Sequence, residues 1–351
     1  MKTFNIVCLP GDGIGPEIVE SAKAVLDAVC PRFGLALNFQ DFAFGGAGID
    51  HYGEPYAPEV RDAVLASDAV FLGAVGGPKW DDAPVRPEAG LLALRKSLDL
   101  FANVRPLAVS GALVAHSPLK REIVEGTDLV IVRELSAGAY FGEPRRLDET
   151  EALDSITYTR AEIERVVRYA FEMARTRRKK LTSVDKANVI ATSKLWRKVV
   201  NEMAADYPDV ALEHMLVDAM AMTLVTQPTA YDVIVTENLF GDILSDEASV
   251  LGGSLGVLAS ASFGSLGIAL YEPSHGSAPD IAGKGIANPI ATILSAAMML
   301  RHSCAADDAA RAIEAGIATM MENDWLTADL NRENPLNTKA FTDKLIQHIP
   351  A

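Results

Sequence analysis

The amino-acid sequence predicts an α/β protein with a mixed, largely parallel sheet divided between two domains. Short runs rich in β-branched and aromatic residues alternate along the chain with amphipathic helical segments, which is the pattern of this fold class. The chain has 351 residues, of which 49% are hydrophobic, so it is too long for one ordinary core and can bury a substantial interior. No flexible linker is visible in the sequence. The domains are therefore expected to share strands, with the chain crossing between them more than once.

The expected elements follow from the apolar runs and from the glycines and prolines between them. Strands are expected at 4–9, 36–42, 68–73, 128–135, 180–185, 212–218 and 231–237. Helices are expected at 16–29, 88–98, 160–177, 193–205, 240–251, 289–301 and 306–320. The two crossings are placed in FANVRP, residues 101–106, and in the glycine-rich passage 251–267. This placement divides the chain into one domain of residues 1–99 with 252–351 and a second of residues 100–251.

The charge balance excludes one large class of partners. The net charge of −15 at pH 7 argues against binding to nucleic-acid backbones, because such binding requires a basic surface. An acidic surface does not exclude a small anionic ligand, since a local arginine cluster can override the overall field. The longest apolar stretch, near 289–300, has about a dozen residues against the ~18 that indicate a membrane span. Neither nucleic acid nor membrane is therefore expected as a partner.

Cysteine usage and the N-terminus predict the compartment. Cys8, Cys30 and Cys304 have neither a metal-ligand spacing nor the even number of a disulfide framework, which suits a reducing environment. Pro10 and Gly11 cut short the first apolar run, so no signal peptide is expected. We expect a cytoplasmic protein.

The passage VCLPGDGIGPEIV, residues 7–19, looks like a nucleotide-binding loop between a strand and a helix. The dinucleotide fingerprint G-x-G-x-x-G requires a third glycine for close helix–strand packing. Here Gly11, Gly13 and Gly15 are followed by Pro16, so that third position is not glycine. A tight strand-to-helix turn explains the pattern equally well. The absence of a G-K-[ST] signature also argues against phosphoryl transfer.

Carboxylates and arginines form the next candidate site. Asp242 and Asp246 are four residues apart and so share one face of a helix, and Asp218 closes an expected strand. Oxygen ligands without His or Cys suit Mg²⁺ or Mn²⁺, although a solvated acidic face is the common alternative. The helix is expected to be largely buried through Phe240, Ile243, Leu244 and Ala248.

Three arginines, Arg95, Arg105 and Arg133, complete this candidate site. Arg105 precedes a proline and must be extended, and Arg133 lies in a β-branched strand, where a permanent charge needs an anionic partner. Each arginine alone is explained by a structural ion pair. Together with a metal, the three would suit a small polycarboxylate held by bidentate contacts.

Three further features suggest chemistry. Lys186 ends a strand and Tyr140 lies in a glycine-flanked turn, and either could transfer a proton, although exposure and packing are the ordinary roles of these residue types. The passage HGSAPDIAGKGIANP, residues 275–289, has the composition of a long functional loop. Its Asp280 could accept a hydrogen bond from a ribose 2′-hydroxyl and repel a 2′-phosphate.

Considered together, these passages resemble the 3-isopropylmalate dehydrogenase branch of the isocitrate/isopropylmalate dehydrogenase family. The resemblance covers about residues 4–301 and comprises GDGIGPEI, VGGPKWDD, LLALRKSLDLFANVRP, YFGEP, VDKANV, ENLFGDILSDEAS and EPSHGSAPDIAGKGIANP. One departure is LSAGAYFGEPRR, where relatives commonly have Leu-Thr-Gly-Gly before the tyrosine region. The small residues are kept there, so the turn is expected to be preserved.

The resemblance implies a two-domain isopropylmalate dehydrogenase-like fold, which is not a Rossmann fold. It also implies NAD-dependent oxidative decarboxylation of 3-isopropylmalate to 4-methyl-2-oxopentanoate, in leucine biosynthesis. Hydride passes from C2 to NAD, and metal-assisted decarboxylation and protonation follow. Residues 1–99 with 252–351 would form the cofactor-side domain, and residues 100–251 the substrate, metal and dimerisation domain. The enzyme would be a homodimer with shared active sites.

The family's site residues carry over where the motifs match. Tyr140 and Lys186 would be catalytic, Arg95, Arg105 and Arg133 would bind the malate carboxylates, and Mg²⁺ or Mn²⁺ would be held by Asp218, Asp242 and Asp246, the first of which would also contact substrate. The cofactor would contact Ile14, Gly77, Pro78, Glu88, Asn188, His275, Gly276, Ser277, Ala278, Pro279, Asp280 and Asn288. The opening loop would thus lie beside the nicotinamide and would not bind the pyrophosphate.

Substrate choice rests on the helix that begins near Glu88. Leu91 and Leu92, three and four residues later, can present an apolar surface beside the arginines, although both could equally be core residues. The match favours an isopropyl pocket. Alternatives are a sister enzyme acting on D-malate or tartrate and a catalytically silent regulatory subunit of a heteromeric dehydrogenase. Retention of the tyrosine, the lysine, the aspartates and the arginines counts against the silent subunit.

Overall fold

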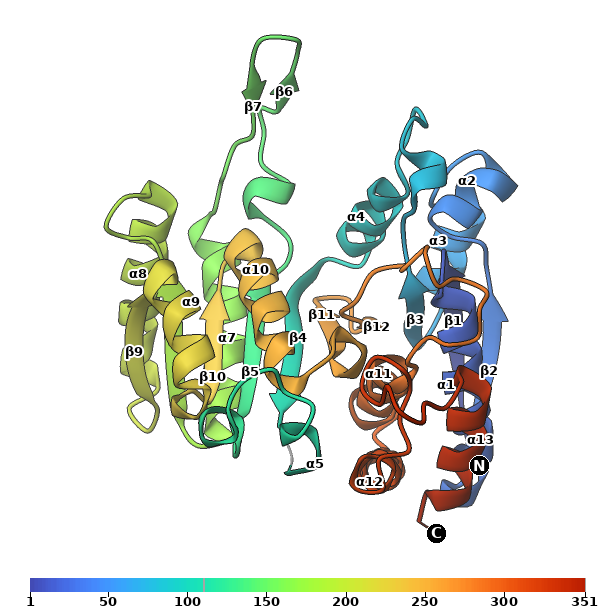
Figure 1. Ribbon diagram of the computed structural model, residues 1–351. Helices are drawn as coiled ribbons and strands as arrows, with labels where there is room; N and C mark the ends of the chain where they lie inside the picture. Colours follow the sequence, from blue (N-terminus) through green and yellow to red (C-terminus); the bar gives the residue numbers. More distant parts are fainter. Residues whose placement is uncertain (110, 351) are drawn as a thin grey trace. The chain divides into compact units, whose positions relative to one another are not determined.

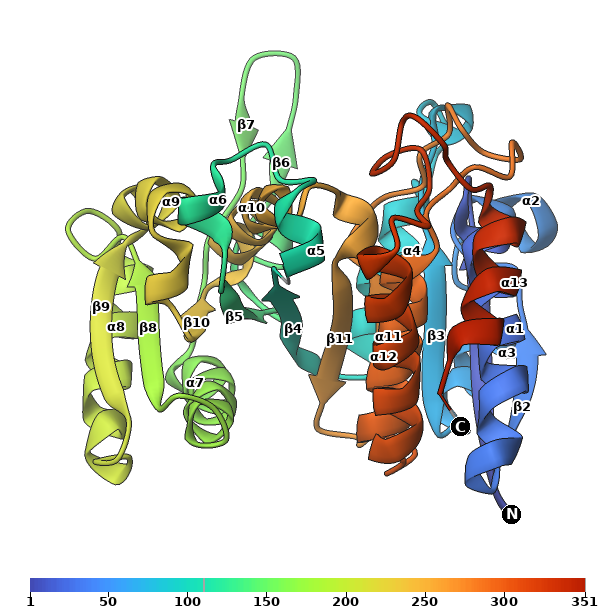
Figure 2. The ribbon, with the colours of Figure 1, turned by 60° about the horizontal axis from the view of Figure 1, so that its bottom comes forward.

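The computed structural model describes residues 1–109 and 111–350, which form two compact units. Unit 1 comprises Met1–Asp99 together with the chain from Gly253 onward, and unit 2 comprises Leu100–Gly252. Each unit has its own set of strands flanked by helices, which can be followed by colour in Figures 1 and 2. The predicted α/β fold with mixed, largely parallel strands is confirmed.

The strands of unit 1 have the order β2-β1-β3-β12-β11. They are β1 (Lys2–Gly11), β2 (Leu35–Asp41), β3 (Ala69–Ala74), β11 (Ala259–Gly264) and β12 (Ala269–Pro273). Neighbours pair in parallel except for β11 with β12, which are antiparallel. Every residue of β3 is buried, as expected for a central strand that is covered on both faces. The carboxyl ends of β1, β3 and β12 lead into the loops in which cofactor contacts were expected.

The helices of unit 1 lie on both sides of these strands. They are α1 (Gly15–Val29), α2 (Gly46–Tyr52), α3 (Pro58–Leu65), α4 (Pro87–Ser97), α11 (Ile290–His302), α12 (Asp307–Glu322) and α13 (Thr338–His348), with short 3₁₀ turns at Cys30–Phe33, Pro78–Trp80 and Leu255–Val257. Pro16 lies in the first turn of α1, where its missing N–H costs nothing. Helix α1 packs against α11 and α13, and α11 packs against β11 and β12.

The strands of unit 2 have the order β4-β5-β10-β8-β9. They are β4 (Leu100–Ala108), β5 (Asp128–Glu134), β8 (Lys180–Asp185), β9 (Ala211–Leu216) and β10 (Val233–Thr236). Only β4 with β5 is antiparallel among these neighbours. A separate antiparallel hairpin consists of β6 (Arg146–Leu147) and β7 (Ala152–Leu153) and projects from the rest of the unit (Figure 1).

The helices of unit 2 are α5 (Gly111–Val114), α6 (Arg121–Val124), α7 (Arg160–Arg175), α8 (Ala191–Met203), α9 (Val217–Thr226) and α10 (Asn238–Ser249), with 3₁₀ turns at Gly138–Tyr140, Ala204–Asp206, Pro228–Ala230 and Val250–Gly252. A reciprocal capping box between Thr159 and Glu162 starts α7. Helix α10 packs on β5 and α9, and α7 packs on β5 and β10. Helix α10 also contacts β4, so it packs on the two neighbouring strands β4 and β5.

Several elements differ from the sequence-based expectation. FANVRP was expected to be a crossing but belongs to strand β4, whose polar residues are buried because they find tertiary partners. The glycine-rich passage 251–267 contains strand β11, which has only small and aromatic side chains and depends on its pairing with β12. Asp218 was expected to close a strand, but β9 ends at Leu216 and Asp218 lies in the first turn of α9. Ile243, expected to be buried, is 59% exposed.

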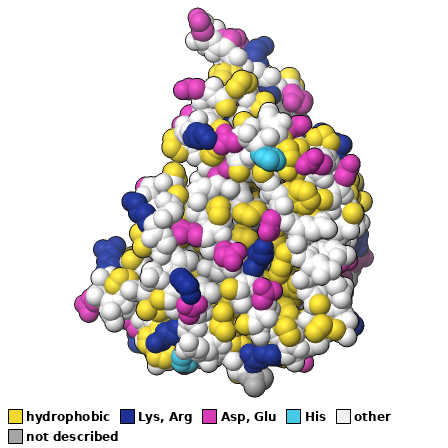
Figure 3. All heavy atoms as spheres, turned by 90° about the vertical axis from the view of Figure 1, so that its right-hand side faces the viewer, with side chains coloured by type: hydrophobic (Ala, Val, Ile, Leu, Met, Phe, Trp, Pro, Cys, Tyr) yellow, Lys and Arg dark blue, Asp and Glu magenta, His cyan; other side chains and the backbone are white. Residues whose placement is uncertain are grey.

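One face of the surface carries charged side chains of both signs (Figure 3). On the face drawn in Figure 3, basic and acidic side chains are interspersed among hydrophobic ones, and no continuous basic patch is visible on the described residues there. None of the helices in the part of the chain that is described is long and apolar enough to cross a membrane.

Candidate active site

Two arginines on neighbouring antiparallel strands form the base of the site in unit 2. Arg105 lies on β4 and Arg133 on β5, and the register places Asn103 directly opposite Arg133. Both arginines are buried, and only 1% of the surface of Arg133 is exposed. Burial of a permanent charge requires compensating partners. The expectation that these strand arginines have anionic partners is met by helix α10.

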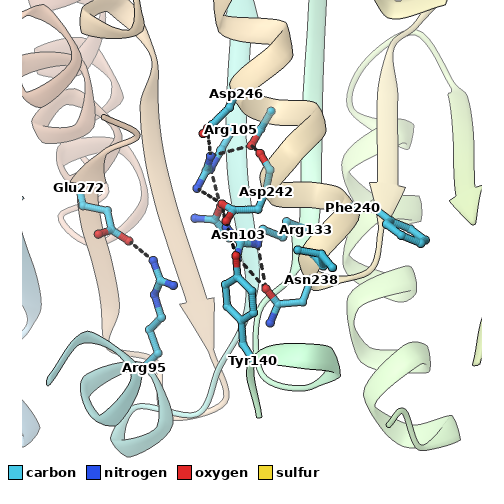
Figure 4. Close-up of polar contacts among 12 residues, drawn as sticks. Arg95, Asn103, Arg105, Arg133, Tyr140, Asn238, Phe240, Asp242, Asp246 and Glu272 are labelled. Carbon is cyan, nitrogen blue, oxygen red and sulfur yellow. Dashed lines mark hydrogen bonds and ion pairs between the residues drawn. The ribbon is translucent and has the colours of Figure 1, made fainter. Parts of the chain in front are cut away.

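Helix α10 presents two carboxylates to these arginines (Figure 4). Arg105 Nη1 lies 3.2 Å from Asp246 Oδ1, and its Nη2 lies 3.5 Å from Asp242 Oδ1. Arg133 Nη1 also donates to Asp242. A Cβ at Gly241 would lie 2.6 Å from Arg133 Cγ, so glycine is required for the helix to approach the arginine stem this closely. The predicted shared face of Asp242 and Asp246 is therefore confirmed, with two cations against it.

Tyr140 joins the same cluster. It ends the 3₁₀ turn Gly138–Tyr140, and its hydroxyl donates to Asp242 Oδ2 at 2.6 Å. The Arg133 guanidinium lies 5.3 Å from the ring centroid. Partial burial raises the pKa of Tyr140, and the carboxylate of Asp242 raises it further. The phenol therefore keeps its proton at neutral pH and can act as an acid.

Lys186 and Asp218 form a second group. Lys186 directly follows β8, and its Nζ lies 2.5 Å from Asp218 Oδ1. The Lys186 ammonium lowers the pKa of Asp218, a mostly exposed carboxyl. No three His, Cys, Asp or Glu side chains among the described residues are grouped so as to hold a metal. Within one chain, the three predicted metal ligands are thus divided between two groups.

Arg95 belongs to unit 1, on α4, and its partner was not predicted. Its Nη2 donates to Glu272 Oε1 on β12 at 3.1 Å (Figure 4), and both side chains are about nine-tenths buried. The buried Nε of Arg95 has no hydrogen-bond partner among the described residues. A buried guanidinium with a spare donor can accept a further anionic ligand.

The rest of α4 carries the candidate specificity residues. Leu91 and Leu92 are half-buried, whereas Leu94 on the same helix is fully buried. Leu91 and Leu92 are therefore not fully buried core residues, and each keeps part of its apolar surface exposed. Glu88 is exposed and makes an ion pair with Arg86. Gly77 and Pro78 lie at the start of the neighbouring 3₁₀ turn.

The opening loop packs against the 275–289 loop in unit 1. Ile14 N donates to Ser277 O at 2.8 Å, and a Cβ at Gly13, whose φ is +59°, would lie 2.0 Å from that same carbonyl oxygen. Ile14 is buried with Ile18 and Ala287. The glycines therefore permit close contact between two loops. This agrees with the interpretation of the passage as a tight strand-to-helix turn.

The remaining cofactor candidates are spread over both units. Asp280 is exposed, and Asn288 is nearly buried, with its Nδ2 donating to Asp329 Oδ2 at 2.9 Å. His275 has a buried Nε2 that lacks a partner among the described residues, and burial lowers its pKa. Gly276 and Pro279 are exposed, and Ala278 is half-buried. Asn188 belongs to unit 2 and is exposed beside Lys186.

Sequence reasoning missed four polar residues that hold the arginines, namely Asn103, Asn238, Ser245 and Glu272. Arg105 Nε donates to Asn103 Oδ1 at 2.9 Å, and its Nη1 donates to Ser245 Oγ at 2.6 Å. A signal was available for Asn103, because residues two apart on a strand share a face. Asn238 pairs with Arg133, which lies 105 residues earlier in the chain, and Glu272 pairs with Arg95, which lies 177 residues earlier. No local sequence pattern reveals such pairs.

The donor sets fit a metal and a nucleotide. Asp242 and Asp246 are hard oxygen ligands on one helix face, and a third carboxylate such as Asp218 would complete a set suited to Mg²⁺ or Mn²⁺. Because His275 Nδ1 donates to Gly276 O, the neutral ring leaves its Nε2 as an acceptor, and the exposed Asp280 offers a second acceptor within the same loop. Such a loop suits the adenosine half of a dinucleotide.

The fold and the site define the class as an α/β decarboxylating dehydrogenase. The family model for isocitrate/isopropylmalate dehydrogenase matches residues 5–345, and the chain belongs to this family. It is 56% identical to a 3-isopropylmalate dehydrogenase of Listeria innocua, with 99% of this chain and 98% of that one covered. It is 57% identical to the 3-isopropylmalate dehydrogenase of a bovine strain of Staphylococcus aureus, with 99% of each covered.

A solved structure agrees with this assignment. The crystal structure of isocitrate dehydrogenase from Methylococcus capsulatus superposes with a TM-score of 0.89 at 38% identity, and 99% of each chain is covered. The family resemblance drawn from the sequence is confirmed.

Proposed function

We propose that this chain catalyses the NAD⁺-dependent oxidative decarboxylation of 3-isopropylmalate to 4-methyl-2-oxopentanoate, a step of leucine biosynthesis. The observation that carries the proposal is the cluster in unit 2, in which Arg105 and Arg133 face carboxylates and a protonated phenol. The relatives named 3-isopropylmalate dehydrogenase match over nearly the whole chain. Unit 1 is the proposed cofactor side, and unit 2 the proposed substrate, metal and dimerisation side.

The arginines bind the substrate in this proposal. Arg105 and Arg133 exchange part of their contacts with Asp242 and Asp246 for the malate carboxylates, and Arg95 is the third arginine assigned to the substrate. Bidentate guanidinium contacts fix the orientation of such a substrate. Asp218, Asp242 and Asp246 would hold Mg²⁺ or Mn²⁺. The partly exposed Leu91 and Leu92 would accept the isopropyl group.

The proton transfers are assigned to two side chains. When bound, the metal would polarise the substrate oxygens and NAD⁺ would accept the C2 hydride. Lys186 assists removal of the proton from the 2-hydroxyl. Tyr140 donates a proton to C3 after CO₂ leaves, and its raised pKa keeps that proton available.

The cofactor site is proposed on the 275–288 loop, with Ile14, Gly77, Pro78, Glu88 and Asn188 as further contacts. The exposed carboxylate of Asp280 favours NAD⁺, because it can accept from a ribose 2′-hydroxyl and repels a 2′-phosphate. The specificity constants for the two cofactors test this assignment. Equal use of NADP⁺ would contradict it.

A homodimer with shared sites is also part of the proposal. In one chain, Lys186 and Asp218 are separate from the cluster of Tyr140, Asp242 and Asp246, so a second copy would complete each site. Ile243 on α10 and Met222 on α9 are 59% and 66% exposed, and α9 packs on α10. These exposed apolar side chains on two packed helices suit an isologous contact with a second copy. We place the enzyme in the cytoplasm.

The deciding experiment measures NADH formation with Mg²⁺ and four substrates: 3-isopropylmalate, isocitrate, D-malate and tartrate. We expect the highest kcat/KM with 3-isopropylmalate. A higher value with D-malate or tartrate would instead assign the chain to a sister enzyme. Absence of turnover with all four would support the silent regulatory subunit.

A further inference from the structure

Each strand arginine of the site is held by the oxygen of an amide side chain (Figure 4). Arg105 Nε donates to Asn103 Oδ1 at 2.9 Å. Arg133 makes two such bonds to Asn238 Oδ1, from Nε at 3.0 Å and from Nη2 at 2.7 Å. Both asparagines are fully buried. The inner edge of the Arg133 guanidinium is therefore fixed, and its Nη1 is directed to Asp242.

The amide acceptor is neutral, and this has an electrostatic consequence. A carboxylate at position 238 would hold the guanidinium with equal geometry, but at short range it would also cancel most of its charge. An amide oxygen orients the group without placing a further negative charge beside it. The choice of asparagine thus suits an arginine that must bind an anionic ligand.

Asn238 has a second contact, on the turn that leads to Tyr140. Its Nδ2 donates to Ala137 O at 2.8 Å, three residues before the tyrosine. Its backbone N–H donates to the Tyr158 hydroxyl at 2.9 Å. A Cβ at Gly138 would lie 2.3 Å from that same hydroxyl oxygen, so the turn sits tightly against this group. The one amide side chain therefore connects the arginine with the turn that carries the phenol.

The position of Asn238 on α10 adds a third connection. It begins the helix and lies four residues before Asp242, so both side chains lie on one face. Asp242 contacts both Arg133 and Tyr140, and Asn238 contacts Arg133 and the residue that precedes the Tyr140 turn. A displacement of Asn238 would move the three groups relative to one another.

We propose that Asn238 is a positioning residue. It orients Arg133 toward the substrate without neutralising it, and it holds the turn that carries Tyr140 in a fixed position relative to Arg133. This rests on the proposed function, in which Arg133 binds a substrate carboxylate and Tyr140 donates a proton. Asn238 itself contacts neither substrate nor cofactor in this assignment. Its role is to couple the anion-binding group and the proton donor.

The test uses the full-length enzyme with substitutions that separate charge from geometry. Asn238→Asp keeps the size and the acceptor oxygen that faces Arg133, but it adds charge and loses the donor to Ala137 O. We expect the KM for 3-isopropylmalate to rise about tenfold or more, the loss of one charge-assisted hydrogen bond. The KM for NAD⁺ should stay within about twofold, because Arg133 is not assigned to the cofactor. Both Asn238→Asp and Asn238→Ala lose the donor to Ala137 O, so kcat should fall in both, whereas only Asn238→Asp adds charge beside Arg133. If Asn238→Ala does not fold, Asn238→Asp remains the decisive variant.

Two further variants make the outcome unambiguous. Asp232→Asn weakens a buried ion pair with Arg177 at the opposite end of β10, and it should lower stability without raising the substrate KM. Arg133→Lys tests the proposed function itself. The calorimetric Kd of 3-isopropylmalate with Mg²⁺ and without NAD⁺ provides a readout without turnover.

The outcomes can be told apart. If Arg133→Lys leaves the substrate Kd unchanged, the proposed substrate site is wrong. If Arg133→Lys weakens binding but both Asn238 variants bind normally, only the positioning role is overturned. An equal rise in KM for Asp232→Asn would show that general destabilisation causes the effect, which would also overturn the role of Asn238.

Discussion

Arg95 on α4 and Glu272 on β12 form a buried ion pair in unit 1, with 3.1 Å between Nη2 and Oε1. The Nε of the same guanidinium is buried and has no partner among the described residues. Structural pairing and ligand binding, the two alternatives that the sequence left for Arg95, are therefore compatible. They predict different effects of substitution.

We expect Arg95→Met to lower the free energy of unfolding by about 3–5 kcal/mol, because it leaves Glu272 as an unpaired buried carboxylate. The double variant Arg95→Met/Glu272→Leu should recover most of this loss. Both should bind 3-isopropylmalate more weakly. Urea unfolding and substrate titration measure the two effects, and unaltered substrate binding in Arg95→Met would make the arginine purely structural.

The separation of Lys186 from Tyr140 leads to a complementation test. We expect Lys186→Ala and Tyr140→Phe homodimers each to be nearly inactive. After they are unfolded and refolded together, roughly half of the dimers are mixed and roughly a quarter of all sites regain both groups. Mass spectrometry confirms mixing. Mixed dimers without recovered activity would place both residues in one site of a single chain.

Asp246 gives the cleaner test of metal binding, because its side chain is 58% exposed and Arg105 retains Asn103 and Ser245 when it is replaced. We expect Asp246→Asn to fold normally and to need at least about tenfold more Mg²⁺ for half-maximal activity. Electron paramagnetic resonance with Mn²⁺ measures binding directly. Glu247→Gln on the same helix is the matched control, and equal Mn²⁺ affinity in both variants would refute the assignment.

Glu134 should make stability depend on pH. It is fully buried and accepts from Ser136 N and Ala137 N, and burial raises the pKa of Glu134 from 4.5 to about 7. Below pH 4.5 both folded and unfolded chains hold the proton. As the pH rises toward 7 only the unfolded chain releases it, so this group lowers the free energy of unfolding by about 3 kcal/mol, and the loss stays constant above that range.

Glu134→Gln should remove this contribution. Urea unfolding at pH 5 and pH 8 checks it, and the difference in stability between the native protein and the variant should change by most of this amount. An exposed position such as Glu122→Gln serves as control. A difference that is the same at both pH values would show that Glu134 is ionised throughout.

Much of the fold could be predicted because its signals are local. The strands and helices around α1, β3, α7, α8 and α11 follow from periodic apolar runs and from caps such as Thr159. Strand β4 was missed because Asn103 and Arg105 interrupt its apolar pattern, and β11 because its small residues have little intrinsic strand preference. Asp218 was misplaced because strand β9 leads directly into α9.

The sequence alone determined the family, the residue types of the site and the shared helix face of Asp242 and Asp246, since these depend on order and spacing along the chain. Only the tertiary structure decided the partners of each arginine. The pairs Arg133–Asn238 and Arg95–Glu272 join segments 105 and 177 residues apart. Strand register and helix packing bring such segments together, and buried polar groups then pair with whichever groups lie within hydrogen-bond distance.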